Sequence, residues 1–184
     1  MENTDKLVIG GGVIKICKDI AHNEVVKQEV VERLKSVLSG HPTGIGLAAP
    51  QIGLDCKVFI LKVGLGPNIK SVMVCRNPII TEYIGSRTVS NEGCLSFPKK
   101  FINTVRAEKI VVSYWDENNN FFSDIKLKGT IALQFQHEID HLEGKTIFDR
   151  EYKGAKSKVG RNEACPCGKE EKGKPIKYKK CCGK

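Results

Sequence analysis

The chain has 184 residues, of which 40% are hydrophobic, and a formal net charge of +9 at pH 7. A chain of this length can bury one sizeable core with a small appendage. No apolar run approaches the roughly 20 residues of a membrane-spanning helix, and the first residues, 1–6, lack the basic stretch of a signal peptide. We therefore expect a cytoplasmic protein without a membrane partner, whose cysteines stay reduced.

The positive charge is concentrated at the C-terminal end. Residues 153–184 hold 11 Lys and Arg against 3 Asp and Glu, whereas residues 1–152 hold 19 against 18. The change falls in a polar, linker-like stretch that begins at Tyr152. We expect two domains, a nearly neutral globular domain over 1–152 and a short basic tail over 153–184.

In chain order, the first elements predicted are a helix and several strands. Residues 24–38 place apolar side chains on one helical stripe, which ends before Gly40 and Pro42. A short apolar run over 57–63 favours a strand, and 71–84 predicts one or two strands around Pro78. The runs 110–115 and 121–127 flank polar residues and predict a hairpin.

The last predicted element of the globular domain is a helix over 131–143. At roughly 100° per residue, one face of this helix carries Ile131, Phe135, Ile139 and Leu142. His137 and His141 project from the other face. The sequence therefore predicts a compact α+β domain with one buried helix that carries metal ligands.

Two histidines four residues apart, with a glutamate after the first, predict a hydrolytic metal site. His137 and His141 lie one turn apart and can grip one ion, while Glu138 can reach a water on that ion. A catalytic ion needs a third protein ligand and an open position for water. Because no histidine follows His141, the third ligand is Glu143, Asp149 or a residue from elsewhere.

Two further stretches contain residues that suit such a site. In Glu92–Ser96, Gly93 permits a tight backbone approach, and Cys94 can ligate a metal as a thiolate. The stretch Gly44–Gly53 is rich in small residues and contains one amide, Gln51, but lacks the lysine and hydroxyl of a phosphate-binding loop. Its glycines favour close passage of the backbone beside a substrate.

Together these three stretches resemble the signatures of the peptide deformylase family, whose members remove the N-formyl group from the initiator methionine of new bacterial proteins. The resemblance covers roughly residues 24–149. It implies a fold of antiparallel strands packed around a central metal-bearing helix, and a monomer that acts on N-formyl-methionyl peptides of nascent chains. It implies Fe²⁺ as the catalytic ion, with Zn²⁺, Ni²⁺ or Co²⁺ as replacements.

Residue roles carry over by position within the matching motifs. The resemblance implies that Cys94, His137 and His141 bind the metal and that Glu138 is the general acid and base. The Gln51 amide and the backbone N–H of Leu95 would stabilise the oxyanion. The backbone that passes beside the substrate comprises Gly44, Ile45, Gly46 and Gly93.

The sequence departs from the family pattern at three places. Residues 9–15 replace a Pro-x-Leu-Arg-like segment, and 97–101 read Phe-Pro-Lys-Lys-Phe where many bacterial members have an arginine. Gln134 stands where an apolar residue would line the methionine pocket. These differences bear on substrate affinity and side-chain preference rather than on the reaction.

The tail contains a second cysteine cluster, Cys165-x-Cys167 followed by Cys181-Cys182. Four thiols so close together predict a closed tetrahedral zinc site, whose ion would supply most of the tail's folding energy. The stretch resembles the zinc tail of the SecA translocase, the SEC-C motif, which implies binding of ribosomal RNA or translocation factors. The alternative for this charge run is a solvated tail.

Two other functions use the same residues. A zinc endopeptidase shares the His-Glu-x-x-His chemistry, although the surroundings of Cys94 and Gln51 speak against it. A ribosome- or translocon-binding protein with an inactive hydrolase domain is the other alternative, and the presence of every catalytic position speaks against that.

Overall fold

The computed structural model describes residues 6–21, 24–64, 71–153, 161–165, 170–171 and 174–181. The chain divides into two compact units, Met1–Glu151 and Tyr152–Lys184. Within the described residues, no helix combines the length and the apolar character needed to cross a bilayer.

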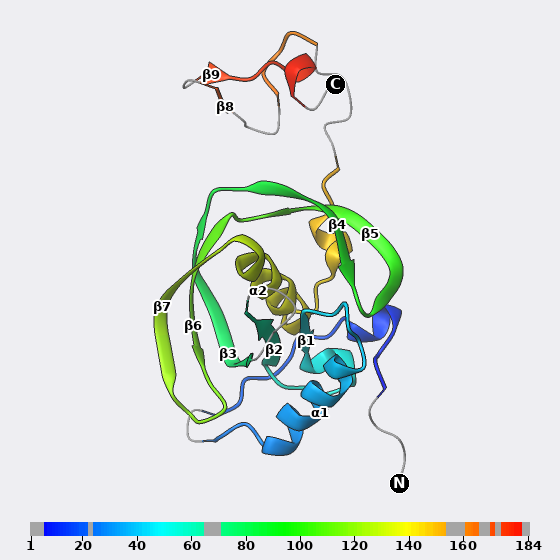
Figure 1. Cartoon of the computed structure of the whole chain (residues 1–184), viewed down its shortest axis with the longest axis vertical. Helices are drawn as coiled ribbons and strands as arrows, with labels where there is room; N and C mark the ends of the chain where they lie inside the picture. Colours follow the sequence, from blue (N-terminus) through cyan, green and yellow to red (C-terminus); the bar gives the residue numbers. More distant parts are fainter. Residues whose placement is uncertain are drawn as a thin grey trace. The chain divides into compact units, whose positions relative to one another are not determined.

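The larger unit is built on an antiparallel five-stranded sheet that curves around a helix (Figure 1). The sheet has the order β1-β2-β3-β6-β7. Its strands are β1 (Gly46–Ala48), β2 (Val58–Val63), β3 (Ser71–Ile84), β6 (Lys109–Trp115) and β7 (Phe121–Lys128). The enclosed helix is α2 (Gly129–Leu142).

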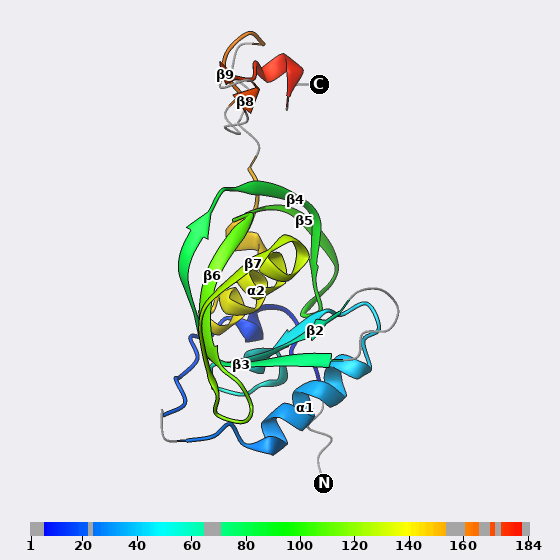
Figure 2. The same ribbon diagram turned by 60° about the vertical axis from the view of Figure 1, so that its left-hand side comes forward.

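Two strands outside this sheet form a separate ribbon. Strands β4 (Arg87–Cys94) and β5 (Phe97–Arg106) pair with each other and arch over α2 (Figure 2). A second helix, α1 (Gln28–Ser39), precedes β1. The short 3-10 turns are η1 (Gly10–Val13), η2 (Ala49–Ile52) and η3 (Ile147–Arg150).

Strand β2 separates two hydrophobic cores. Because successive side chains of a strand point to opposite faces, Phe59 and Leu61 face one core while Val58 and Ile60 face the other. The first core packs α2 on the sheet, where the rings of Phe59 and Phe135 meet edge-on with centroids 4.9 Å apart. The second core packs α1 against β1 and β2. Burial on both faces explains why the first four residues of β2, Val58–Leu61, form an unbroken apolar run.

The structure confirms the predicted α+β class, the hairpin of β6 and β7, and the strand that begins near Lys57. Residues 71–84 form a single strand, and the register shifts between Arg76 and Ile79 accommodate Pro78, which has no N–H for the ladder. The predicted helix at 24–38 begins too early, because α1 starts at Gln28. Arg76 Nη1 donates to the carbonyl oxygens of Ala21 and Glu24, which holds this segment outside the helix.

The smaller unit contains little regular structure in its described part. Strands β8 (Glu170–Glu171) and β9 (Lys174–Pro175) pair, and the 3-10 turn η4 covers Tyr178–Lys180. The backbone N–H of Cys165 donates to the carbonyl of Ile176 over 2.7 Å. Of the four tail cysteines, Cys165 and Cys181 are described, while Cys167 and Cys182 lie outside the described residues.

Candidate metal centre

Helix α2 carries three potential catalytic side chains in a buried position. His137, Glu138 and His141 are only 7%, 2% and 1% exposed. The apolar face of α2, with Phe135 and Leu142, packs on the sheet, so the spacing of apolar residues aims the histidines away from that core. The ribbon of β4 and β5 arches over α2 (Figures 1 and 2), and Glu92 of the ribbon contacts His137.

The third residue of the group comes from the end of β4. The Cys94 sulfur lies 3.2 Å from His141 Nε2, and one ligand atom from each of Cys94, His137 and His141 lies within 4.8 Å of the others. The two acidic residues that the sequence also offered as the third ligand make other contacts. Glu143 pairs with Lys145 over 2.6 Å, and Asp149 accepts a hydrogen bond from the Thr146 N–H.

These donors fit a divalent transition metal. Burial lowers the pKa of His141 well below its usual value, which keeps this imidazole neutral and able to ligate. The Nδ1 of His137 lies 2.7 Å from Glu92 Oε1, so its Nε2 is the nitrogen left for an ion. One thiolate and two imidazoles suit Zn²⁺, Fe²⁺ and neighbouring metals, and three protein ligands leave a position for water.

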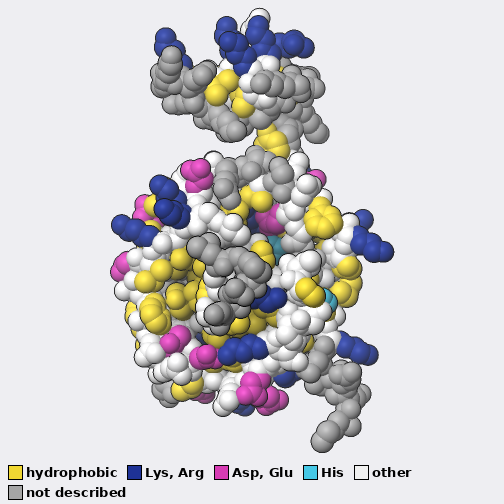
Figure 3. Space-filling view, in the orientation of Figure 1, with side chains coloured by type: hydrophobic (Ala, Val, Ile, Leu, Met, Phe, Trp, Pro, Cys, Tyr) yellow, Lys and Arg dark blue, Asp and Glu magenta, His cyan; other side chains and the backbone are white. Residues whose placement is uncertain are grey.

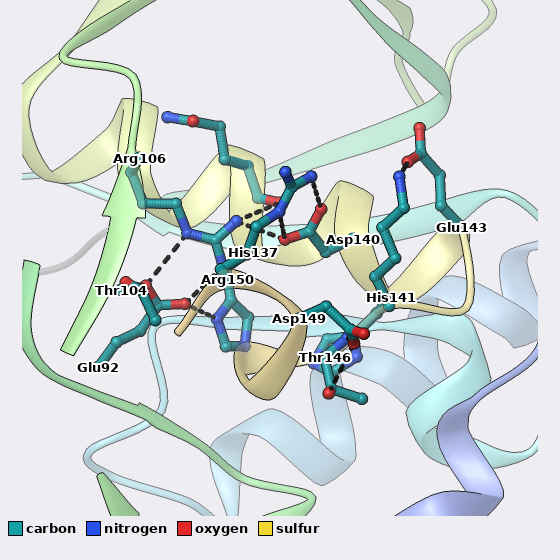
Figure 4. A network of polar contacts seen from close by, with 12 residues as sticks. Glu92, Thr104, Arg106, His137, Asp140, His141, Glu143, Thr146, Asp149 and Arg150 are labelled. Carbon is teal, nitrogen blue, oxygen red and sulfur yellow. Dashed lines mark hydrogen bonds and ion pairs between the residues drawn. The ribbon is translucent and has the colours of Figure 1, made fainter. Parts of the chain in front are cut away.

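A buried network of ion pairs includes the carboxylate of Glu92, which contacts His137 (Figure 4). Arg106 Nη2 pairs with Glu92 Oε1 over 2.6 Å, and Arg106 Nη1 also pairs with Asp140. Arg150 joins the network at Asp140 over 2.7 Å. Burial acts to raise the pKa of Glu92, but the hydrogen bonds from His137 and Arg106 outweigh it and hold that pKa well below its usual range.

Sequence reasoning assigned no role to Glu92, Arg106 or Asp140. Two of them stand inside the motifs, Glu92 two residues before Cys94 and Asp140 one residue before His141. A charged residue on a helix that is predicted to be buried requires a partner. That rule applied to Asp140 signals an ionic network, although it does not identify Arg106.

The amide of Gln51 has a defined orientation. Its Oε1 accepts a hydrogen bond from the Ala48 N–H over 2.9 Å, which directs its Nε2 toward the ribbon. There Nε2 donates to Ser96 Oγ over 3.1 Å and lies 3.7 Å from the Cys94 sulfur. The Gln51 Nε2 donor is therefore held beside Cys94, a candidate metal ligand. A substrate oxygen that gains negative charge there could accept a hydrogen bond from Nε2.

Glu138 is positioned to exchange a proton. Burial raises the pKa of its carboxyl to about 7. Its Oε2 has no hydrogen-bond partner among the described residues. A Cβ added at Gly46 would overlap Glu138 Oε1 and would approach Leu61 Cδ2 to 2.6 Å, so only glycine fits here. An unpartnered carboxylate that titrates near neutral pH can accept and return a proton.

A cleft of about 610 Å³ opens onto this group. All of the predicted substrate-contacting residues line the cleft, namely Gly44, Ile45, Gly46, Gln51, Gly93 and Leu95. Cys94, His137 and Glu138 also line it, whereas His141 lies deeper. The N-terminal residues Leu7 and Ile9 complete one wall, and hydrogen bonds from Val8 N–H to the Gln51 carbonyl and from Gly10 N–H to the Ser96 carbonyl fix that segment.

Comparisons with a family profile, with curated proteins and with solved structures all give the same family. The profile of the Polypeptide deformylase family matches residues 13–157. Among curated proteins, the peptide deformylase of Thermotoga petrophila is 38% identical over 123 residues, which cover 67% of this chain and 71% of that protein. The Thermotoga maritima peptide deformylase is 36% identical over 144 residues, which cover 78% of this chain and 84% of that one.

Solved structures share the fold. The crystal structure of Thermotoga maritima peptide deformylase superposes with a TM-score of 0.69 at 32% identity and covers 80% of this chain and 97% of that chain. A Met-Ala-Ser-bound class I type b peptide deformylase from Acinetobacter baumannii gives a TM-score of 0.71 at 25% identity, covering 79% and 96%. Since the profile match spans most of the chain and both α2 and the ribbon lie inside it, the chain belongs to the peptide deformylase family.

Proposed function

We propose that this enzyme hydrolyses the N-formyl group from the initiator formyl-methionine of newly made proteins and releases formate. Membership of the family supports this reaction. The observation that carries it is the convergence of Cys94, His137 and His141 within 4.8 Å, with Glu138 on the same helix.

The residues divide the reaction among them. Cys94, His137 and His141 would hold a divalent ion, which would lower the pKa of a bound water. Glu138 accepts a proton from the attacking water as the water oxygen bonds to the formyl carbon. The Gln51 Nε2 and the Leu95 N–H donate hydrogen bonds to the carbonyl oxygen as it becomes negative. Glu138 then returns the proton to the leaving amine. Gly44, Ile45, Gly46 and Gly93 bring backbone beside the substrate.

The proposed reaction is tested with Glu138→Gln. This substitution keeps the size of the side chain but removes the group that carries the proton, so we expect formate release from formyl-Met-Ala-Ser to fall by about 10²- to 10⁴-fold. Metal analysis should find equal catalytic metal in both proteins. Wild-type cleavage of casein, without formate release from the formyl peptide, would instead support the zinc endopeptidase alternative.

The native ion is proposed to be Fe²⁺, with Zn²⁺, Ni²⁺ or Co²⁺ able to replace it. A thiolate with two imidazoles supports this range of metals. Both ferrous iron and the Cys94 thiolate can oxidise. Iron-loaded enzyme should therefore lose activity faster in air than under anaerobic conditions, and the zinc-loaded enzyme should differ less. Equal half-lives for the iron enzyme with and without oxygen would argue against iron.

The tail, residues 153–184, is proposed to be a SEC-C-like zinc module separate from the catalytic domain 1–152. Its four cysteines, Cys165, Cys167, Cys181 and Cys182, would bind one Zn²⁺. The division of the chain after Glu151 and the backbone pairing of Cys165 with Ile176 support a small folded unit.

This module is proposed to bind ribosomal RNA or a translocation factor in the cytoplasm, next to nascent substrate, with the enzyme acting as a monomer. Lysine and arginine side chains gather on the small unit (Figure 3). A cavity of about 350 Å³ there is lined by Lys174, Lys177, Lys179 and Lys180. Ribosome co-sedimentation of the full chain, but not of residues 1–152, should weaken with salt. Identical behaviour of the two would contradict the proposal.

A further inference from the structure

The cleft in front of the metal ligands has an uneven distribution of charge. Besides histidines, its charged lining residues are Lys99, Lys100 and Glu138. Glu138 is 2% exposed at the inner end, whereas both lysines are exposed. Neither lysine has an ion-pair partner in the described part of the chain. The accessible mouth of the cleft is therefore cationic.

The register of the ribbon fixes these lysines next to a metal ligand. Cys94 pairs with Phe97, while the preceding residue, Gly93, pairs with Phe101. One step along β4 thus corresponds to four along β5, and Pro98, Lys99 and Lys100 form a bulge outside the ladder. Bulges of this kind redirect side chains beside active sites.

Backbone conformation and packing hold the bulge in place. Lys99 has a φ of 63°, in the left-handed region that residues with a side chain rarely adopt. The Phe101 ring lies so close over Gly93 that a Cβ there would meet its Cε1 at 2.9 Å. The bulge is therefore anchored at its base, and the flexible stems of the lysines extend from it.

We propose that Lys99 and Lys100 are specificity-determining residues that favour acidic side chains at the third and fourth residues of the formyl-methionyl peptide. This inference rests on the proposed function, because it places the formyl group at the metal ligands. An extended peptide rises about 3.3 Å per residue, so residues beyond the second leave the inner end and reach the mouth. Unpaired cations there attract carboxylates and repel lysine side chains.

The test compares kcat/KM for three peptides, formyl-Met-Ala-Asp-Asp, formyl-Met-Ala-Ser-Ser and formyl-Met-Ala-Lys-Lys. Exposed ion pairs are weak, so we expect the wild-type enzyme to prefer the acidic over the basic peptide by about three- to tenfold at low salt. The preference should shrink at about 500 mM salt, where screening is strong. Lys99→Gln/Lys100→Gln should abolish it, and Lys99→Glu/Lys100→Glu should reverse it.

The matched control is Lys109→Glu/Lys126→Glu, which changes the net charge equally on exposed positions of β6 and β7 outside the cleft. This control should keep the wild-type preference. If it loses the preference as the cleft variants do, overall charge is responsible and the proposal is wrong. If the wild-type enzyme cleaves the neutral peptide but has equal kcat/KM for the acidic and the basic peptide, the inference about Lys99 and Lys100 is wrong. The proposed deformylase function would still stand. A wild-type enzyme that cleaves none of the peptides overturns both.

Discussion

At the scale of single residues, Glu92 holds the imidazole of His137, one of the three candidate metal ligands. Its Oε1 lies 2.7 Å from His137 Nδ1, and Arg106 and Thr104 both donate to the same carboxylate. Every acceptor position therefore faces a donor. A carboxylate in this position fixes the imidazole tautomer and raises its basicity as a ligand.

The substitution Glu92→Gln tests this role. The new amide would bring an N–H₂ group against the donors of Arg106 and His137, so we expect about 10- to 100-fold weaker metal binding. Loss of one partner of a buried ion pair should also lower the free energy of unfolding by about 3 kcal/mol. Chelator competition and urea unfolding measure the two effects. Glu108→Gln, on an exposed residue, is the control, and wild-type metal affinity in Glu92→Gln would refute the role.

Gly46 is a second residue whose identity is set by a neighbouring side chain, that of Glu138. A methyl group there would overlap Glu138 Oε1 and crowd Leu61. Gly46→Ala should therefore displace Glu138, lower kcat by more than about tenfold and reduce the melting temperature. Gly11→Ala is the control, because the one described atom that its Cβ would meet within 4 Å is Ile14 Cδ1, at 4.0 Å. If Gly46→Ala and Gly11→Ala are equally active, strand β1 can move to accommodate the methyl group without displacing Glu138.

At the scale of elements, one side chain fastens α2 to the sheet. Gln136 accepts a hydrogen bond from the Ala107 N–H over 2.9 Å and donates to the Ala107 carbonyl over 3.0 Å. The side-chain amide of Gln136 thus pairs with the backbone between β5 and β6 in the way that a neighbouring strand would. The helix that carries both histidines is located by this pairing as well as by its apolar face.

Replacement of Gln136 by leucine would leave two buried backbone groups unpaired. Each such group costs about 1–3 kcal/mol, so urea unfolding should show a loss of at least about 2 kcal/mol. Gln134→Leu provides the same chemical change two residues earlier on the half-buried cleft side. It should alter KM for formyl-methionyl peptides but leave stability near that of wild type. A stable Gln136→Leu protein would show that the apolar face alone locates α2.

At the scale of the whole molecule, the catalytic unit contains both hydrophobic cores. The residues of each core all belong to Met1–Glu151. A unit with its own core can fold alone. A protein of residues 1–152 should therefore keep kcat/KM for formyl-Met-Ala-Ser within about twofold of the full chain and should contain one zinc fewer per chain. Insolubility or loss of deformylation in this truncated protein would contradict the predicted boundary.

The sequence alone determined the local features of this protein. The spacing of His137 and His141, the apolar stripe of α2 and the hairpin of β6 and β7 depend on periodicities that act within a few residues. The motifs around Gln51, Cys94 and Glu138 indicated the family for the same reason, because each is a short contiguous run. The start of α1 was misjudged because Arg76, far along the chain, holds the preceding segment.

Only the tertiary structure decided which distant groups meet. Glu92, Arg106 and Asp140 form their network across separations of up to 48 positions, and no local pattern encodes such pairings. The ribbon of β4 and β5 was not predicted, because the buried positions of β5 include the polar residues Thr104 and Arg106, so burial alternates along the strand while hydrophobicity does not. The bulge that brings Lys99 and Lys100 to the cleft depends on the register between β4 and β5, in which Gly93 pairs with Phe101 and Cys94 with Phe97, and not on the sequence of the bulge itself.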